Sequence, residues 1–129
     1  MEIKKIKVQD VLTCSEEDSL KVISEKLKEN KDRRIFVISS DNELKGIITT
    51  TDLVYKALCS EDCGNNLKAK DIMTTDVRSV DINEDINKAL EIMDDLKTFV
   101  CPLTEDKKLL GLVEYNDIVE HVLESIKEN

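Results

Sequence analysis

The sequence predicts a mixed α/β fold made of two copies of one strand-helix-strand-strand-helix unit. The clearest sign of duplication is the stretch GIITTTD at residues 46–52, which returns as GLVEYND at residues 111–117, 65 positions later. In both places a short apolar run leads into an amphipathic segment, and this pattern predicts a buried strand that turns into a helix. Apolar residues at helical spacing also recur 66 positions apart, as the pairs Leu20 and Ile86, Ile23 and Ala89, and Leu27 and Met93.

The first copy follows this order from residue 11. After a short apolar stretch at residues 11–14, the Ser and acidic residues at 15–19 are typical of a helix start. A helix is predicted over residues 20–30, because Leu20, Ile23 and Leu27 share one face. The continuous apolar run at residues 35–38 predicts a strand buried on both faces. A second strand at 44–49 and a helix from 52 to 58 complete the copy.

The second copy repeats the same elements. We expect a turn at residues 70–74, a strand at 77–80, a helix at 86–96, strands at 100–103 and 109–113, and a helix at 118–126. Pro102 lacks an amide donor, so its strand is expected to lie at a sheet edge or to have the proline near its end. The offset falls from 66 to 65 before the glycine, which we interpret as one residue lost between helix and hairpin.

Composition argues against several partners. The formal net charge is −9, whereas nucleic-acid binding depends on Lys and Arg that displace counterions from phosphates. No apolar stretch approaches the roughly 18 residues of a membrane-spanning helix, and the N-terminus lacks the apolar core of a secretion signal. We therefore expect a cytoplasmic protein that binds neither nucleic acid nor membrane.

The cysteine pattern and the lack of catalytic motifs argue against a metal site and against an enzyme. All four cysteines are expected to be reduced, and Cys14 and Cys101 lie in apolar contexts typical of small core side chains. Cys59 and Cys63 are far from His121 in sequence and lack the paired spacing of structural zinc ligands. No nucleophile motif, His cluster or Gly-rich phosphate loop is present. We expect neither an enzyme nor a metal site, with thiol or metal sensing through Cys59 and Cys63 as an open alternative.

The element order and two motifs, GIITTTD at 46–52 and KDIMT at 70–74, resemble the cystathionine β-synthase (CBS) domain, whose tandem copies form a Bateman module. The resemblance spans about residues 8–126. It implies a pair of repeats with pseudo-two-fold symmetry and a cleft between them that holds an adenosyl ligand such as AMP, ATP or S-adenosylmethionine. It also implies a homodimer packed through helices 52–58 and 116–126. We place the first CBS repeat at 1–60, a linker at 61–69 and the second repeat at 70–129.

The resemblance assigns Asp52 to the ribose and Thr49 to the phosphate of such a ligand, with Thr51 included in the candidate site. A carboxylate can accept hydrogen bonds from both ribose hydroxyls, and a threonine hydroxyl can donate to a phosphate at a helix N-terminus. Arg34 matches a basic residue that family members use near phosphate, and a guanidinium suits phosphate oxygens.

The second copy differs at these positions. Glu114 replaces Thr49, which sets a negative charge where a phosphate would bind, and Phe99 falls where Arg34 would be. Asp117 remains and could still hold a ribose. The sequence therefore predicts one competent nucleotide site and one that is vacant or takes an adenosyl ligand without phosphate.

Simpler interpretations stay open. Thr49, Asp52 and Asp117 could be ordinary helix caps, and Arg33 and Arg34 a solvated connection. Two functions follow from these alternatives. One is a ligand-sensing module which, with no output domain in the chain, would modulate a separate partner protein. The other is a ligand-free assembly module whose helices mediate protein contacts.

Overall fold

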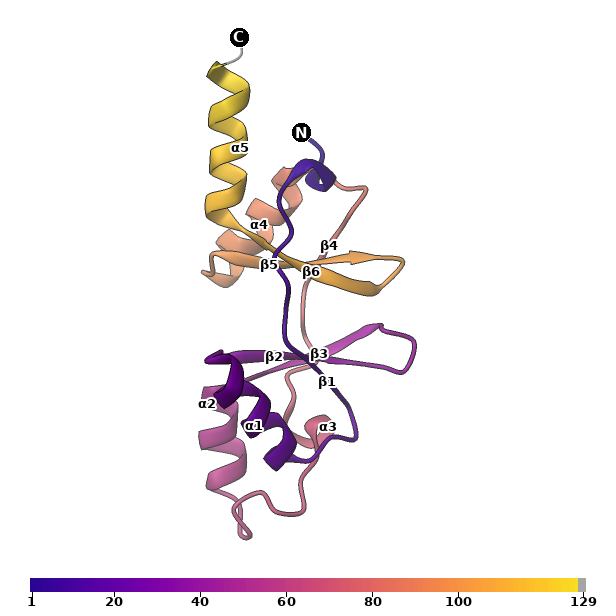
Figure 1. Cartoon of the computed structure of the whole chain (residues 1–129), viewed down its shortest axis with the longest axis vertical. Coiled ribbons are helices and arrows are strands. Elements are labelled where there is room, and N and C mark those ends of the chain that lie inside the picture. The colour runs from indigo at the N-terminus through magenta and orange to yellow at the C-terminus, as the bar shows by residue number, and fades with distance from the viewer. Residues whose placement is uncertain (128–129) are drawn as a thin grey trace. The chain divides into compact units, whose positions relative to one another are not determined.

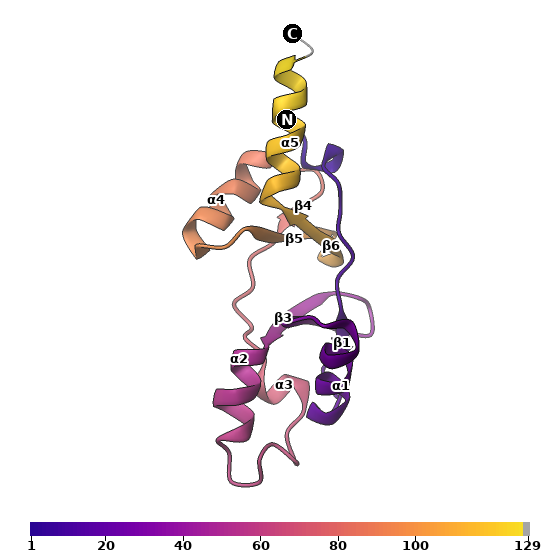
Figure 2. The same cartoon turned by 60° about the vertical axis from the view of Figure 1, so that its left-hand side comes forward.

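The structure is a computed structural model that describes residues 1–127. It divides into two compact units, Val11–Val77 and a second unit in which Met1–Asp10 joins Arg78–Asn129. Each unit holds a three-stranded sheet, and in each the longer helices lie on one face of that sheet (Figures 1 and 2). The predicted α/β fold with two strand-helix-strand-strand-helix repeats is confirmed.

The unit Val11–Val77 is built around a sheet of order β1-β2-β3, in which β1 is parallel to β2 and β2 antiparallel to β3. Its elements are β1 (Thr13–Ser15), α1 (Leu20–Asn30), β2 (Arg34–Ile38), β3 (Leu44–Thr49), α2 (Thr50–Asp52) with its π-helical continuation (Leu53–Leu58), and α3 (Ala69–Ile72). The α1 helix starts where the sequence predicted, because the Ser19 hydroxyl accepts the Val22 N–H at 3.3 Å. It ends at Lys31, which adopts a left-handed conformation with φ 51°.

The other unit repeats this arrangement with a sheet of order β4-β5-β6. Its elements are a 3-10 turn (Ile3–Lys5), β4 (Val80–Asp81), α4 (Ile86–Leu96), β5 (Val100–Glu105), β6 (Lys108–Glu114) and α5 (Tyr115–Lys127). Fully buried aliphatic side chains fill both cores, including Ile23, Ile35 and Ile48 in one unit and Ile92 and Val113 in the other. Stability therefore comes from aliphatic packing, in keeping with an aromatic content of only 3%.

Pro102 corrects an expectation. Its strand β5 is the central strand of the sheet and not an edge. In the first repeat the equivalent residue, Phe36, donates its N–H to the Leu12 carbonyl at 2.9 Å. Pro102 has no such donor, and the neighbouring β4 begins only at Val80, which pairs with Leu103. The proline is tolerated in a central strand because the adjacent strand is too short to need the missing hydrogen bond.

The first ten residues pack with the second repeat, not with the first. We call residues 1–10 the first leading segment. Gln9 donates its N–H to the Leu112 carbonyl at 2.8 Å and accepts the Leu112 N–H at 2.9 Å, so the segment lines the free edge of β6. Ile3 and Ile6 of this segment are 0% and 4% exposed within that unit's core.

Residues 68–77, the second leading segment, make the corresponding contacts in the unit Val11–Val77. Thr74 exchanges two backbone hydrogen bonds with Ile47 on β3, at 2.9 and 3.0 Å. Ala69 and Ile72 of this segment are buried in the same core as β2 and β3. Each repeat is therefore completed by the segment that precedes the other repeat in the sequence. The predicted boundaries of the repeats and the linker follow the order of the repeats along the sequence, and not the division into compact units. They stay a prediction.

The glycine that opens each repeated motif makes this contact possible. A Cβ atom added at Gly46 would lie 2.8 Å from the Thr74 carbonyl oxygen, and one added at Gly111 would lie 2.5 Å from the Gln9 carbonyl oxygen. Both distances are shorter than any side chain tolerates. Both copies keep the glycine because a leading segment crosses directly over it.

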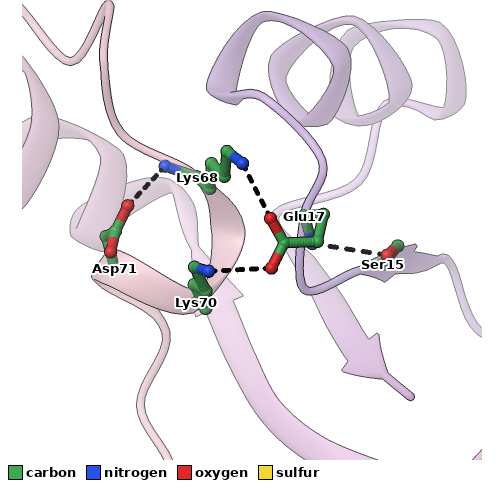
Figure 3. A network of polar contacts seen from close by, with 5 residues as sticks. All are labelled: Ser15, Glu17, Lys68, Lys70 and Asp71. Carbon is green, nitrogen blue, oxygen red and sulfur yellow. Dashed lines mark hydrogen bonds and ion pairs between the residues drawn. The ribbon is translucent and has the colours of Figure 1, made fainter. Parts of the chain in front are cut away.

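An exposed ion-pair network also holds the second leading segment in place (Figure 3). The Glu17 carboxylate accepts from Lys68 Nζ at 2.7 Å and from Lys70 Nζ at 2.8 Å. These two hydrogen bonds lower the pKa of Glu17 from 4.5 to about 2. The network joins the loop after β1 to the start of α3, so it links parts of the chain that are more than fifty positions apart.

Candidate functional site

Thr49 and Asp52 lie where β3 turns into α2, and they bond each other reciprocally. The Asp52 N–H donates to Thr49 Oγ1 at 3.2 Å, while Asp52 Oδ2 accepts the Thr49 N–H at 2.9 Å and lies 3.2 Å from Thr49 Oγ1. This is a capping box, in which the first turn's free amides are satisfied by side chains. The simple capping interpretation is therefore present in the structure, and it also fixes the carboxylate and the hydroxyl side by side.

The second oxygen of Asp52 is engaged as well. Lys56 Nζ lies 3.2 Å from Asp52 Oδ1, one helical turn further on. The same ammonium donates to the Ile72 carbonyl at 3.1 Å. The Asp52 side chain is only 15% exposed. A ribose that used Asp52 would have to share this oxygen with Lys56 or displace its ammonium.

Arg34 and Thr49 are direct partners in the antiparallel register of β2 and β3. Side chains of directly opposed residues lie on one face of the sheet, roughly 5 Å apart at Cβ. The structure therefore brings Arg34, Thr49 and Asp52 to one end of the hairpin. Thr51 follows in α2 and is exposed. Whether these residues bind a ligand stays a prediction.

The register also corrects the alignment of the two copies. Val100 is paired with Glu114, as Arg34 is with Thr49, so Val100 and not Phe99 is the counterpart of Arg34. Phe99 corresponds to Arg33, since the Tyr115 N–H donates to the Phe99 carbonyl at 2.8 Å and the Thr50 N–H to the Arg33 carbonyl at 3.0 Å. The residue that the second copy lacks is lost in the turn between the hairpin strands.

The corrected alignment leaves the chemical contrast unchanged, because Val100 is as uncharged as Phe99. Phe99 is 73% exposed and contacts the ring of Tyr115 edge to face, with 5.9 Å between ring centroids. The second hairpin thus ends in an apolar, aromatic surface where the first hairpin has two arginines.

Asp117 lies in the first turn of α5 in the other unit, with a different partner. Its Oδ2 accepts from Gln9 Nε2 at 3.0 Å, and both side chains are partly buried. Gln9 belongs to the first leading segment, 108 positions away. Sequence reasoning missed Gln9, because nothing in its local pattern shows that residues 1–10 pack on the second repeat.

All four cysteines are free thiols, two of them buried and two exposed. Cys14 and Cys101 are buried core residues, as predicted, and burial raises the pKa of each thiol to about 11. Cys59 and Cys63 are exposed free thiols. No group of three or more His, Cys, Asp or Glu side chains within this range is arranged to hold a metal ion.

Two segments of the chain, residues 3–58 and 69–124, match the sequence model of the CBS domain. The chain belongs to the CBS-domain family. Pairs of CBS domains are regulatory modules that often bind nucleotides, and they are generally not enzymes. Within residues 1–127, no helix has both the length and the apolar character to cross a membrane.

Two relatives of this CBS-domain chain illustrate its range of similarity. It is 30% identical over 113 residues to an uncharacterised protein of Methanopyrus kandleri, covering 87% of this chain and 58% of that protein. It is 25% identical over 114 residues to hypoxic response protein 1 of Mycobacterium tuberculosis, covering 88% of this chain and 80% of that protein. The chain thus spans little more than half the length of the first of these relatives.

Solved structures show the same fold. A crystal structure of hypoxic response protein I with two coordinated zinc ions matches with a TM-score of 0.76 at 21% identity, covering 94% of this chain and 98% of that one. The cytosolic domain of the Mg²⁺ channel MgtE in complex with ATP also matches with a TM-score of 0.76, at 19% identity, covering 93% of this chain and 48% of that one.

Proposed function

We propose that this CBS pair is a cytoplasmic regulatory module that binds an adenine nucleotide or another adenosyl compound and thereby modulates a partner protein. The observation that carries the proposal is the grouping of Arg34, Thr49 and Asp52 at one end of the first hairpin. A guanidinium, a hydroxyl and a carboxylate are the groups that a phosphate and a ribose diol require. The ATP bound to the MgtE domain supports this class of ligand.

Regulation requires more than binding. A ligand shifts an equilibrium only by the difference in its affinity for the two states. The Lys56 ammonium offers such a difference, because it bonds both Asp52 Oδ1 and the Ile72 carbonyl. We propose that a ribose competing for Asp52 loosens Lys56 from Asp52, and that this change reaches the second leading segment through Ile72.

The test is isothermal calorimetry of the whole chain with adenosine, AMP, ATP and S-adenosylmethionine. Asp52→Asn is expected to weaken binding at the first site, since an amide is a poorer acceptor for the ribose hydroxyls. Lys56→Met is the matched control, because it removes the ion pair and leaves the carboxylate. It is expected to bind as well as or better than the unmodified chain. If none of the four compounds binds, the proposed function is refuted.

The second candidate function, assembly without ligand, is favoured by exposed apolar side chains on the closing helices of both repeats. Leu58 is 61% exposed and its counterpart Leu123 is 50% exposed, with Tyr55 and Ile126 exposed nearby. The homodimer expected from the resemblance would cover these residues. Sedimentation of the chain with Leu58→Glu and Leu123→Glu tests this arrangement, since a dimer packed through either helix should dissociate.

A further inference from the structure

Gln9 stands out because it is the residue of the first leading segment that bonds a candidate ligand-binding carboxylate. Its backbone is fixed by both hydrogen bonds to Leu112. Its side chain then reaches Asp117 Oδ2 at 3.0 Å. In the other unit the equivalent residue is Thr74, which bonds Ile47 in the same way but does not bond Asp52 among the described contacts.

The two carboxylates are therefore oriented by different means. Asp52 is held by the Thr49 capping box and by Lys56. At Asp117, Glu114 occupies the place of Thr49 and carries a like charge, so it cannot donate to the carboxylate as a hydroxyl does. The Gln9 amide approaches from the leading segment instead. Gln9 thus provides the donor that the hairpin itself lacks.

The bond also leaves specific groups available. A carboxylate oxygen accepts more than one hydrogen bond, and a carboxamide has a second N–H and a carbonyl oxygen. The Gln9 and Asp117 pair therefore presents acceptors and one donor, which suits the hydroxyls of a ribose. Glu114, with the uncharged Val100 opposite it, adds negative charge without a cation. This combination opposes a phosphate and accepts a neutral or cationic ligand.

We propose that Gln9 is the positioning residue of the second site, and that the Gln9 and Asp117 pair selects a ribosyl ligand without a phosphate group. The proposal rests on the proposed function and assigns its second site a ligand class. It also makes the first ten residues part of that site.

The experiment measures adenosine and AMP binding by calorimetry in the full chain carrying Asp52→Asn, so that the second site dominates. Adenosine is expected to bind more tightly than AMP. Gln9→Ala is expected to reduce adenosine affinity at least about tenfold, as for loss of a hydrogen bond to a charged group. Gln9→Glu should reduce it further, because two carboxylates then face each other. Thr74→Ala, the matched change in the other leading segment, should leave it unchanged.

Two further measurements separate positioning from a general structural effect. In the chain carrying Asp117→Asn, Gln9→Ala should leave AMP affinity at the first site unchanged, whereas a disturbed fold would weaken both sites. In the chain carrying Asp52→Asn, Glu114→Thr should raise AMP affinity, since it restores the hydroxyl of the first repeat.

Different failures have different meanings. If the unmodified chain binds none of the compounds, the proposed function and this inference are both overturned. If binding occurs but disappears entirely with Asp52→Asn, the proposed function stands at the first site and the inference is overturned. Unchanged adenosine affinity in Gln9→Ala, or AMP binding as tight as adenosine binding at the second site, also overturns the inference.

Discussion

Thr49 and Glu114 occupy the same place in two hairpins of the same register, so a hydroxyl in the first repeat is replaced by a carboxylate in the second. The Thr49 hydroxyl accepts the Asp52 N–H at 3.2 Å and completes the capping box. At the residue scale the two repeats therefore share a scaffold and differ in chemistry. Two consequences can be measured directly, one on stability and one on ligand selectivity.

Thr49→Ala should destabilise the chain by about 1 kcal/mol, the usual cost of removing a hydroxyl cap. The loss arises because the Asp52 N–H would have no side-chain acceptor. Urea unfolding of the whole chain without ligand measures it. Thr50→Ala, at the exposed neighbouring position, is the control and should change stability much less. Equal effects of the two substitutions would show that the cap does not contribute.

Arg34→Met should lower affinity for AMP while changing affinity for adenosine little. The guanidinium lies opposite Thr49 and is expected to contact only the phosphate. Calorimetry with the two compounds gives the ratio of affinities. Arg33→Met is the matched control, since Arg33 precedes the strand and is exposed. A parallel loss of both affinities would place Arg34 outside the phosphate site.

The candidate residues show where sequence reasoning reaches its limit at this scale. Spacing alone brought Thr49 and Asp52 together, because both lie in one strand-to-helix turn. It misaligned Phe99 with Arg34, since a single lost residue can be placed anywhere between two matched motifs. The structure places that loss in the hairpin turn, where chain length is least constrained by packing. Gln9 carried no local signal at all.

At the element scale, local signals predicted the helices better than the short strands. Ser19 and Lys31 mark the ends of α1 by chemistry that acts within one turn. The strand predicted at residues 77–80 is instead Val80–Asp81, and Pro102 lies in a central strand. Both errors come from the pairing of β4 with β5. Pro102 of β5 has no N–H to donate, so β4 begins only at Val80, which pairs with Leu103. The sequence of one strand does not show how it pairs with its neighbour.

The ion-pair network of Glu17 with Lys68 and Lys70 gives a pH-dependent prediction. The folded-state pKa of Glu17 is about 2, below its ordinary value of 4.5. Its ion pairs therefore stabilise the fold above about pH 4.5, and this contribution is lost as the pH falls toward 2. Glu17→Gln should lower the melting temperature slightly near neutral pH and make stability less dependent on pH in that acidic range.

Thermal unfolding between pH 2 and pH 7 at low salt measures this effect. The shift should be small, since the Glu17 side chain is 58% exposed, and it should shrink at high salt. Glu29→Gln, on the exposed side of α1, serves as the control. If Glu17→Gln leaves the acid dependence unchanged, the network does not stabilise the second leading segment.

For the whole molecule, the duplicated α/β architecture could be predicted because periodicity and spacing repeat over most of the chain. The exchange of leading segments could not, since residues 1–10 and 68–77 are each short and carry no periodic signal that names a partner. Ile3 and Ile6 read as ordinary apolar residues in a polar stretch, yet they belong to the core that β5 and β6 form. Only long-range contacts establish this assignment.

Two fragments of nearly equal length test the exchange. A fragment of residues 11–77 contains a complete compact unit and should unfold cooperatively, although its small size makes it marginally stable. A fragment of residues 1–66 contains the first repeat but lacks Ala69 and Ile72 of its core, and it should not fold alone. Circular dichroism with urea titration distinguishes them. Cooperative folding of the second fragment would contradict the importance of the second leading segment.

The position of Gln9 on β6 also sets an order of events during synthesis. Residues 11–77 can close as soon as they leave the ribosome, but residues 1–10 find their partner only after Leu112 has been made. At typical elongation rates, the first leading segment waits on the order of a few seconds beyond the completion of the first unit. For that interval the newborn chain exposes Ile3 and Ile6, which are buried in the core of the finished unit.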